Sequence, residues 1–297
     1  MTGMAIETLN LSKSFGGTAA VRGLNLAVPR GSICGFLGRN GAGKTTALKM
    51  LLGMQRPDSG EGRVLGCPID TAAGSLAIRR RAAFVSEGKE LYPYMTVEQM
   101  IRFTRSFFPG WRHDLERRYR ELFDLPPKVG VPALSKGMRT KLFLLLAMAR
   151  GSELLLLDEP TEGLDPAMIE DVLQAFAGLA ASEATTIFFS SHQIAEIEQI
   201  ADRVTIIDRG RVVVDDVLDD LKVRYRRVHA VFEGDAPETV PALDGVDHVY
   251  RHGRVLSILA HNHIDAVAAC ARRMSASSVE VRPVTLKEIF LEHVRAK

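Results

Sequence analysis

The sequence predicts an α/β fold with an N-terminal antiparallel β lobe, an inserted helical lobe and a small C-terminal α+β domain. Three observations lead to this prediction. A glycine-rich loop follows a short apolar run and precedes a helical pattern, as in a strand-loop-helix unit of a parallel sheet. Three helical patterns later follow one another without a strand between them. The C-terminal part returns to short alternating apolar segments, which favour strands.

Length and composition are those of an ordinary globular protein, because 46% of the 297 residues are hydrophobic and 25% are charged. The chain is long enough for one large or two moderate domains. We expect a main domain at residues 1–220, with the helical lobe at about 90–150, and an accessory domain at 221–297. The net charge of +2 gives no electrostatic argument for binding nucleic acid, so no such partner is expected.

The longest unbroken apolar run, Leu142 to Ala149, is much shorter than the roughly 20 residues that a spanning helix needs. Residues Met1 to Leu11 lack the basic start and long apolar core of a signal peptide. The three cysteines, Cys34, Cys67 and Cys270, form no metal or disulfide framework. We therefore expect a chain that does not cross a membrane and that works in a reducing cytoplasm.

The N-terminal stretch from Ile6 to Val28 alternates apolar and polar residues around Gly16-Gly17 and Gly23, which predicts short antiparallel strands. Phe15 is expected in a turn ahead of the glycine-rich loop. An exposed aromatic ring at this place can stack on a nucleotide base. A half-buried hairpin aromatic is an equally good interpretation, and position alone does not choose between them.

The glycine-rich loop fits the phosphate-binding pattern G-x-x-x-x-G-K-[ST]. Glycines allow the backbone to approach a polyphosphate and to aim its N–H groups at it. Lys44 can then reach the β- and γ-phosphates, the Thr45 hydroxyl can bind Mg²⁺, and Thr45 to Gly53 is predicted as a helix whose positive end faces the anion. The predicted nucleotide-binding residues here are Gly38, Arg39, Asn40, Gly41, Ala42, Gly43, Lys44, Thr45 and Thr46.

A short strand at Gly62 to Leu65 and a helix that includes Arg79 to Arg81 are predicted next, and the arginines are interpreted as a solvated basic face. A buried strand, Ala82 to Val85, then ends at Ser86-Glu87. In the helical lobe, Thr96 and Gln99 form a capping box. Two more helices are predicted, one from His113 to Phe123 and one from Lys136 to Arg150, which Ser135 caps and Gly151 ends.

The apolar run from Leu154 to Leu157 ends in two acids, Asp158 and Glu159, as expected of a strand that is buried on both faces. Its end should lie beside the phosphate loop. There, Asp158 can hold Mg²⁺, and Glu159 can orient or deprotonate the water that attacks a γ-phosphate. We therefore predict Asp158 as a metal residue and Glu159 as a catalytic residue.

Asp165-Pro166 is predicted to open a helix that extends to about Ala180, because aspartate at the N-cap precedes proline at the first helical position. A further buried strand, Thr185 to Ser190, delivers His192 to the same sheet edge. Its imidazole can hydrogen-bond the γ-phosphate or the attacking water. Taken alone, a histidine after a strand is more often structural.

The C-terminal part begins after two strands within Val204 to Val214 that meet at Asp208-Arg209-Gly210. An acidic and then basic stretch follows, which we interpret as a solvated linker or helix. A small sheet covered by two helices is then expected, and Thr285 and Glu288 form a capping box on the second helix. His261 and His263 show no evident partner for a metal site. The predicted strand segments are Val228 to Phe232, Val246 to Leu259 and Val279 to Val284, and the helices are Ile264 to Met274 and Leu286 to Val294.

Residues 5 to 215, with these motifs in this order, closely resemble the ATP-binding subunit of an ATP-binding-cassette (ABC) transporter, a P-loop NTPase. The resemblance is strongest to the bacterial, exporter-like branch in which ATPase and membrane subunits are separate chains. It identifies Gly38 to Thr46 as Walker A, Leu154 to Glu159 as Walker B, and Leu134-Ser135-Lys136-Gly137-Met138 as the signature stretch. Gly163-Leu164-Asp165 resembles the D-loop, and His192 the switch histidine.

The resemblance implies an enzyme that hydrolyses ATP with Mg²⁺ and powers transport by a separate integral membrane permease. It implies a head-to-tail homodimer, or a heterodimer with a related ATPase, peripheral at the cytoplasmic face of the membrane. Two ATP molecules then lie between Walker A of one chain and the signature of the other. Ser135, Gly137 and Asp165 are thereby expected at the nucleotide, and Phe15 falls where the family places its adenine-stacking aromatic.

Two departures from the family pattern stand out. Lys136 and Met138 replace a glycine and the glutamine of the usual LSGGQ signature. Glu87 stands where most members have a glutamine that joins the metal site to the membrane partner, and we predict that Glu87 is linked to Mg²⁺ and couples hydrolysis to that partner. Tyr92-Pro93-Tyr94 is a candidate docking surface, with core packing as an equal alternative.

Two other functions are kept as alternatives. One is an ABC ATPase without a permease that acts on nucleic acid or ribosomes, although the tandem cassettes, coiled coils or basic extensions usual in such proteins are not visible. The other is a regulatory module that uses ATP as a dimerisation switch with little turnover. Glu159 and His192 argue against the switch, and Lys136 in the signature argues for it.

Overall fold

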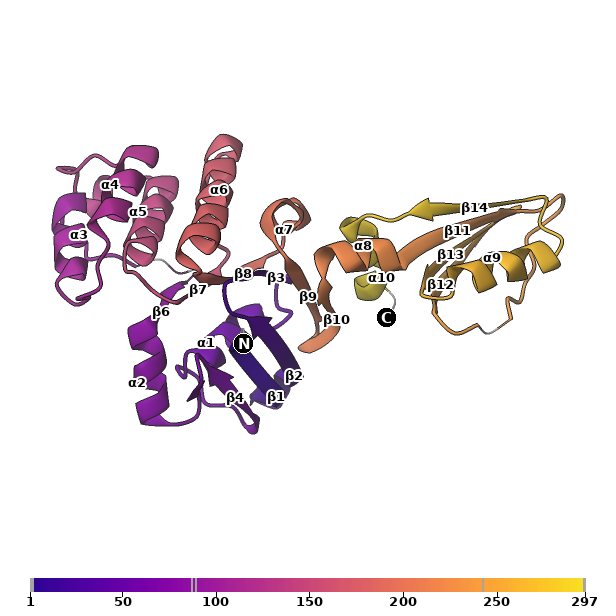
Figure 1. Ribbon diagram of the computed structural model, residues 1–297, viewed down its shortest axis with the longest axis horizontal. Coiled ribbons are helices and arrows are strands. Elements are labelled where there is room, and N and C mark those ends of the chain that lie inside the picture. The colour runs from indigo at the N-terminus through magenta and orange to yellow at the C-terminus, as the bar shows by residue number, and fades with distance from the viewer. Residues whose placement is uncertain (1–2, 87, 89, 242, 296–297) are drawn as a thin grey trace. The chain divides into compact units, whose positions relative to one another are not determined.

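The computed structural model describes residues 3–86, 88, 90–241 and 243–295. The chain divides into two compact units, Met1–Asp215 and Asp216–Lys297 (Figure 1). In the part of the chain that the structure describes, no helix combines the length and the apolar character that crossing a membrane requires.

The first unit begins with an antiparallel sheet in the order β2-β1-β4-β5. Strands β1 and β2 each contain 12 residues, so this lobe is built from longer strands than the sequence predicted. Phe15 is the last residue of β1 rather than a turn residue, and it pairs with Thr18 across the tight Gly16-Gly17 turn. The strands are β1 (Met4–Phe15), β2 (Thr18–Pro29), β4 (Ser59–Val64) and β5 (Cys67–Pro68).

A six-stranded sheet in the order β10-β9-β3-β8-β7-β6 forms the centre of this unit. Its neighbours from β9 to β6 pair in parallel, which confirms the predicted parallel core. All residues of β3, β7 and β8 are buried, as apolar strands covered on both faces should be. The strands are β3 (Ile33–Leu37), β6 (Ala82–Val85), β7 (Leu154–Asp158), β8 (Thr186–Ser191), β9 (Arg203–Asp208) and β10 (Arg211–Val217).

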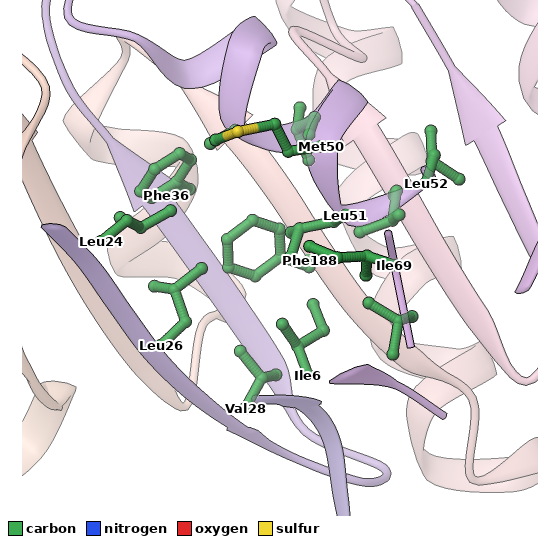
Figure 2. Close-up of a cluster of buried hydrophobic side chains, with 14 of the residues drawn as sticks. Ile6, Leu24, Leu26, Val28, Phe36, Met50, Leu51, Leu52, Ile69 and Phe188 are labelled. Carbon is green, nitrogen blue, oxygen red and sulfur yellow. The ribbon is translucent and has the colours of Figure 1, made fainter. Parts of the chain in front are cut away.

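The main core lies where the two sheets meet helix α1 (Lys44–Leu51), as Figure 2 shows. Ile6 and Leu26 contribute to this core from the antiparallel sheet. Phe36 and Phe188 contribute from the parallel sheet, and the centroids of their two rings lie 5.2 Å apart. Met50 and its neighbours anchor α1 in this core. Because α1 directly follows the glycine-rich loop, burial of its apolar face fixes the position of that loop.

The helical lobe consists of α3 (Val97–Arg105), α4 (His113–Leu122) and α5 (Lys136–Met148), a group visible together in Figure 1. The predicted capping box is confirmed, because the Gln99 N–H donates to Thr96 Oγ1 at 3.2 Å and the Thr96 N–H donates to Gln99 Oε1 at 2.8 Å. A short 3₁₀ turn, η1 (Val131–Ala133), precedes α5.

The remaining helices of the first unit are α2 (Ala72–Arg81), α6 (Pro166–Glu183) and α7 (Ile194–Ile200). Asp165 caps α6 by accepting the Met168 N–H at 3.0 Å, with proline at the first helical position, as predicted. Helix α2 ends in the predicted arginine run, in which Arg81 pairs with Glu153 at 2.6 Å rather than only facing solvent.

The second unit is a four-stranded sheet in the order β12-β13-β11-β14, with a core of its own that includes α9. The segment Val246 to Leu259 contains two strands that turn at Gly253. His261 does have a partner, because its Nδ1 lies 2.7 Å from Asp247 Oδ2; among the described residues, however, no cluster suited to a metal ion occurs. The elements are α8 (Leu218–Arg224), β11 (Tyr225–Val231), β12 (Val246–His252), β13 (Val255–His261), α9 (Ile264–Arg273), β14 (Ser278–Pro283) and α10 (Leu286–Arg295).

Candidate functional site

The glycine-rich loop has the backbone that a phosphate cradle needs. Gly41 and Gly43 have φ values of 80° and 107°, which side-chain-bearing residues rarely adopt. A Cβ on Gly43 would also lie 2.3 Å from the Ala20 carbonyl oxygen, so no larger residue fits. Helix α1 starts at Lys44, one residue before the predicted Thr45, and its N-terminus faces the cradle.

Lys44 is buried at the base of the loop, with 6% of its surface exposed. Its Nζ donates a hydrogen bond to the Gly38 carbonyl at 2.6 Å and forms an ion pair with Glu159 Oε1 at 3.2 Å. The loop thus holds the ammonium group from one side and the end of β7 holds it from the other.

Asp158, the last residue of β7, connects three elements. The Thr45 hydroxyl donates to its Oδ2 at 2.7 Å, and the Ser190 hydroxyl donates to its Oδ1 at 2.6 Å. The Ser190 contact follows from strand register, because Asp158 pairs with Ser190 between the parallel strands β7 and β8. Ser190 Oγ also accepts the Glu159 N–H at 3.1 Å, so one hydroxyl orients both acids.

Glu159 follows β7 in a left-handed backbone conformation, with φ of 47°, which is uncommon for a residue with a side chain. The turn directs its carboxylate back to the sheet edge, where Oε2 lies 2.8 Å from His192 Nδ1. Because a carboxylate accepts hydrogen bonds, Nδ1 of His192 is the donor in this contact. The predicted base and the predicted switch histidine are therefore neighbours.

These side chains line a pocket of about 360 Å³ at the edge of the parallel sheet. Of the predicted site residues, Phe15, Gly38, Ala42, Ser135, Gly137 and Asp165 are not among its lining. Phe15 exposes 49% of its surface at the end of β1, which fits both the half-buried hairpin aromatic and a ring that can stack on a base. Among the described residues, the lining consists of Ala20, Arg39, Asn40, Gly41, Gly43, Lys44, Thr45, Thr46, Asp158, Glu159, Glu162 and His192.

The signature stretch packs against the turn after Glu159. Ser135 caps α5 by accepting the Met138 N–H at 3.1 Å, as predicted. A Cβ on Gly137 would lie 2.9 Å from the Gly163 carbonyl oxygen, so a larger residue at this position would crowd the turn. Lys136, the departure from the family pattern, extends along Gly163 and pairs with Glu162 at 2.6 Å. Its ammonium thus has a partner within the same chain.

Sequence reasoning missed several residues of the site. Ser190 was assigned only to a strand, and Ala20 and Glu162 were given no role. The available signal for Ser190 was the pairing of parallel strands, which places a hydroxyl beside the acid at the neighbouring strand end. Glu87, predicted as a metal residue, lies outside the residues that the structure describes.

The chemistry of the pocket combines cations, backbone donors, hydroxyl groups, carboxylates and an imidazole. A loop of N–H groups with Lys44 suits a polyphosphate, and the oxygens of Thr45 and Asp158 suit a hard cation. Glu159 and His192 complete a pair that can handle the proton of an attacking water. Together these groups suit hydrolysis of a nucleoside triphosphate.

Comparison with known proteins supports this chemistry. A family model described as ABC transporter matches residues 21–162. The bacitracin transport ATP-binding protein BcrA of Bacillus licheniformis is 33% identical over 294 residues, which cover 93% of this chain and 94% of that protein.

Solved structures show the same fold. The structure of an ATP-binding subunit of an ABC transporter is 28% identical with a TM-score of 0.67, covering 74% of this chain and 92% of that one. A dimeric bacterial ABC transporter cassette is 21% identical with a TM-score of 0.65, covering 72% and 98%. This chain therefore belongs to the ABC transporter family and is one of its ATP-binding, ATP-hydrolysing subunits.

Proposed function

We propose that this chain hydrolyses MgATP within a head-to-tail dimer and thereby drives a separate membrane permease. The observation that carries the proposal is the meeting of Lys44, Thr45, Asp158, Glu159 and His192 in one pocket, from the phosphate loop and the ends of adjacent strands. Each group has the charge or hydrogen-bonding capacity that phosphoryl transfer to water requires.

In this proposal the phosphate loop binds the triphosphate through its N–H groups, and Lys44 holds the β- and γ-phosphates. The ammonium already faces the pocket, where it pairs with Glu159 at 3.2 Å. A phosphate oxygen can replace the Glu159 carboxylate as its partner. That exchange would release Glu159 to contact water only after the nucleotide is bound.

The proposed magnesium site consists of Thr45 Oγ1 and one oxygen of Asp158, which lie 2.7 Å apart. The donor set fits, because Mg²⁺ in nucleotide sites takes one or two protein oxygens, with phosphates and waters as its other ligands. Ser190 holds the second oxygen of Asp158, so the carboxylate keeps one oxygen directed at the pocket. The ion would neutralise charge on the phosphates.

Glu159 is the proposed general base, and His192 the group that orients it and reaches the γ-phosphate. Their 2.8 Å contact supports these roles, because a base must be held in a defined orientation to take a proton. Because Nδ1 donates to Glu159, His192 can also donate from Nε2 to a γ-phosphate oxygen only as the imidazolium.

The proposed dimer is supported by predicted nucleotide-binding residues that do not line the pocket of their own chain. Ser135, Gly137 and Asp165 do not line that pocket, and Ser135 is exposed at the start of α5. A hydroxyl and a helix N-terminus there can enclose the phosphates held by a second chain. A protein of the same fold forms a dimer, which supports this assembly.

The permease is proposed to dock on an aromatic surface cluster formed by Tyr92, Tyr94, Phe103 and Phe107. Neighbouring rings of the cluster lie 5.0 to 5.6 Å apart, and Tyr94 exposes 75% of its surface, so core packing does not explain it. A cluster of exposed aromatics marks an interaction surface. The similarity to a transport ATP-binding protein supports a permease as its partner, which would place the chain at the cytoplasmic face of the membrane.

The same similarity favours transport over action on nucleic acid or ribosomes.

The ATP-driven dimerisation switch differs from our proposal in turnover, and this difference can be measured. We expect the purified chain to release phosphate from ATP continuously when Mg²⁺ is present, and to form a dimer that dissociates as ATP is consumed. Phosphate release assays with and without EDTA, combined with light scattering, test this. A stable dimer without phosphate release would instead support the switch.

Replacing Tyr94 by alanine should weaken binding of the permease by about 30-fold, as expected when the central aromatic of an interface is removed. Basal ATP hydrolysis should stay at the wild-type rate, because Tyr94 does not line the nucleotide pocket. Co-purification from membranes and permease-stimulated hydrolysis measure the change. Leu9→Ala is the matched control, since Leu9 is also exposed but lies on β1. Equal permease binding by the Tyr94→Ala variant and wild type would refute the docking surface.

A further inference from the structure

Glu196, in the first turn of α7, is a carboxylate that is almost completely buried, with 3% of its surface exposed. Both of its oxygens accept hydrogen bonds from hydroxyl groups. Thr161 Oγ1 donates to Oε1 at 2.6 Å, and Ser191 Oγ donates to Oε2 at 2.7 Å. The sequence analysis gave this residue no role, and it does not line the nucleotide pocket.

The two hydroxyl groups belong to the segments that carry the catalytic pair. Thr161 is two residues after Glu159, and Ser191 directly precedes His192. Ser191 Oγ also accepts the Gln193 N–H at 2.9 Å, which fixes the turn around His192. Together with the 2.8 Å contact between Glu159 and His192, these bonds close a ring of contacts. Glu196 therefore joins the two segments at a second place, besides the contact between Glu159 and His192.

Burial of this carboxylate is costly, because desolvation disfavours its charged form and raises the pKa of Glu196. The hydrogen bonds from Thr161 and Ser191 act in the opposite direction. An apolar residue of similar volume would fill the same space without this cost. The presence of a buried carboxylate with hydrogen bonds to both oxygens is therefore best explained by the positions in which it holds its two hydrogen-bond partners.

We infer that Glu196 is a positioning residue for ATP hydrolysis, which holds Glu159 and His192 in register by joining the segment after β7 to the loop after β8. The inference rests on the proposed function, because it assigns Glu196 a task in orienting the proposed base. Glu196 acts through Thr161 and Ser191 and does not contact the nucleotide. It should affect the chemical step and leave ATP binding unchanged.

Glu196→Leu tests this inference, because leucine fills the space and accepts no hydrogen bond. We expect kcat to fall by about 10- to 100-fold, because a small displacement of a catalytic group can lower the rate by that much. KM for ATP should stay near the wild-type value, because Lys44 and the phosphate loop are untouched. Glu196→Gln should restore most of kcat, because its carbonyl oxygen accepts from one hydroxyl and its amide donates to the other. Gln199→Ala, at an exposed position of α7, is the matched control.

A second readout does not depend on turnover. In protein with ¹⁵N-labelled histidine, the ring signals of His192, assigned with a His192→Gln variant, should change in Glu196→Leu and stay near wild type in Glu196→Gln. The inference is overturned if these signals and kcat match wild type in folded Glu196→Leu, or if kcat and KM change while the signals do not. Wild-type protein that fails to hydrolyse ATP would instead refute the proposed function, and the histidine signals would still report the positioning role.

Should Glu196→Leu fail to fold, Thr161→Val and Ser191→Ala take its place, because each removes one hydroxyl and leaves the carboxylate present. Both variants are expected to lower kcat and shift the His192 signals in the same direction. The double variant should lower kcat by less than the product of the two single effects, because both hydroxyl groups act through Glu196. Independent effects that multiply would contradict a shared role.

Discussion

Glu159→Gln should reduce the rate of phosphate release by about 1000-fold, within the range that general bases contribute. Glutamine has the same shape and still accepts a hydrogen bond from His192, but it cannot take a proton from water. ATP affinity should be retained or increased, because the variant removes the negative charge that lies 3.2 Å from Lys44 Nζ and competes with phosphate for it. The dimer with bound ATP should therefore accumulate.

Single-turnover phosphate release and light scattering in the presence of MgATP measure these two effects. Glu121→Gln is the matched control, because it makes the same change on the exposed face of α4. Wild-type turnover by the Glu159→Gln variant would remove Glu159 from the role of base. Loss of ATP binding together with turnover would show that this carboxylate is needed to build the site rather than to carry out chemistry.

Lys44→Ala should weaken ATP binding by about 10- to 100-fold, the equivalent of losing one or two hydrogen bonds to a charged group. The Lys44 ammonium is buried at the base of the phosphate loop, where it donates a hydrogen bond to the Gly38 carbonyl oxygen at 2.6 Å. In the alanine variant, the loop N–H groups and the helix N-terminus remain to bind the triphosphate at this point. The rate of ATP hydrolysis should fall together with ATP binding.

Titration with a fluorescent ATP analogue measures the affinity, and the shift of Tm on adding ATP provides an independent readout, because a ligand stabilises only the protein that binds it. Lys49→Ala is the control, since Lys49 is exposed on the same helix, α1. An unchanged Tm shift in Lys44→Ala would place the triphosphate elsewhere. A lowered Tm in both variants would report a change in helix stability instead.

Much of the fold could be predicted from sequence because its elements have strong local signals. The buried strands that precede Lys44 and Glu159 are continuous apolar runs, and both are strands in the structure. The caps formed by Thr96 and Asp165 are also confirmed, since capping depends on a few neighbouring residues. The α/β fold of the ABC family is therefore established twice, by motif order and by the observed sheets.

Other features escaped prediction because they depend on segments that are distant in the sequence. The left-handed conformation of Glu159 has no local signature, since glycine is the residue expected at positive φ. The segments expected to be short strands around Gly23 are two long strands, because β1 and β2 stay paired on both sides of Gly23, which lies in a register shift between them. The partner of Lys136 in the signature stretch is Glu162, which only the packing of α5 against Gly163 shows.

The sequence by itself determined the family, the order of the elements and the residue types that handle phosphate, because motif spacing and hydrophobic periodicity are local properties of the chain. Only the tertiary structure decided which of these residues meet. Strand register placed Ser190 against Asp158, and the packing of α7 brought Glu196 to Thr161 and Ser191. Hydroxyl and carboxylate groups carry no periodic signal, so their pairing appears only when parallel strands bring distant loops to one edge.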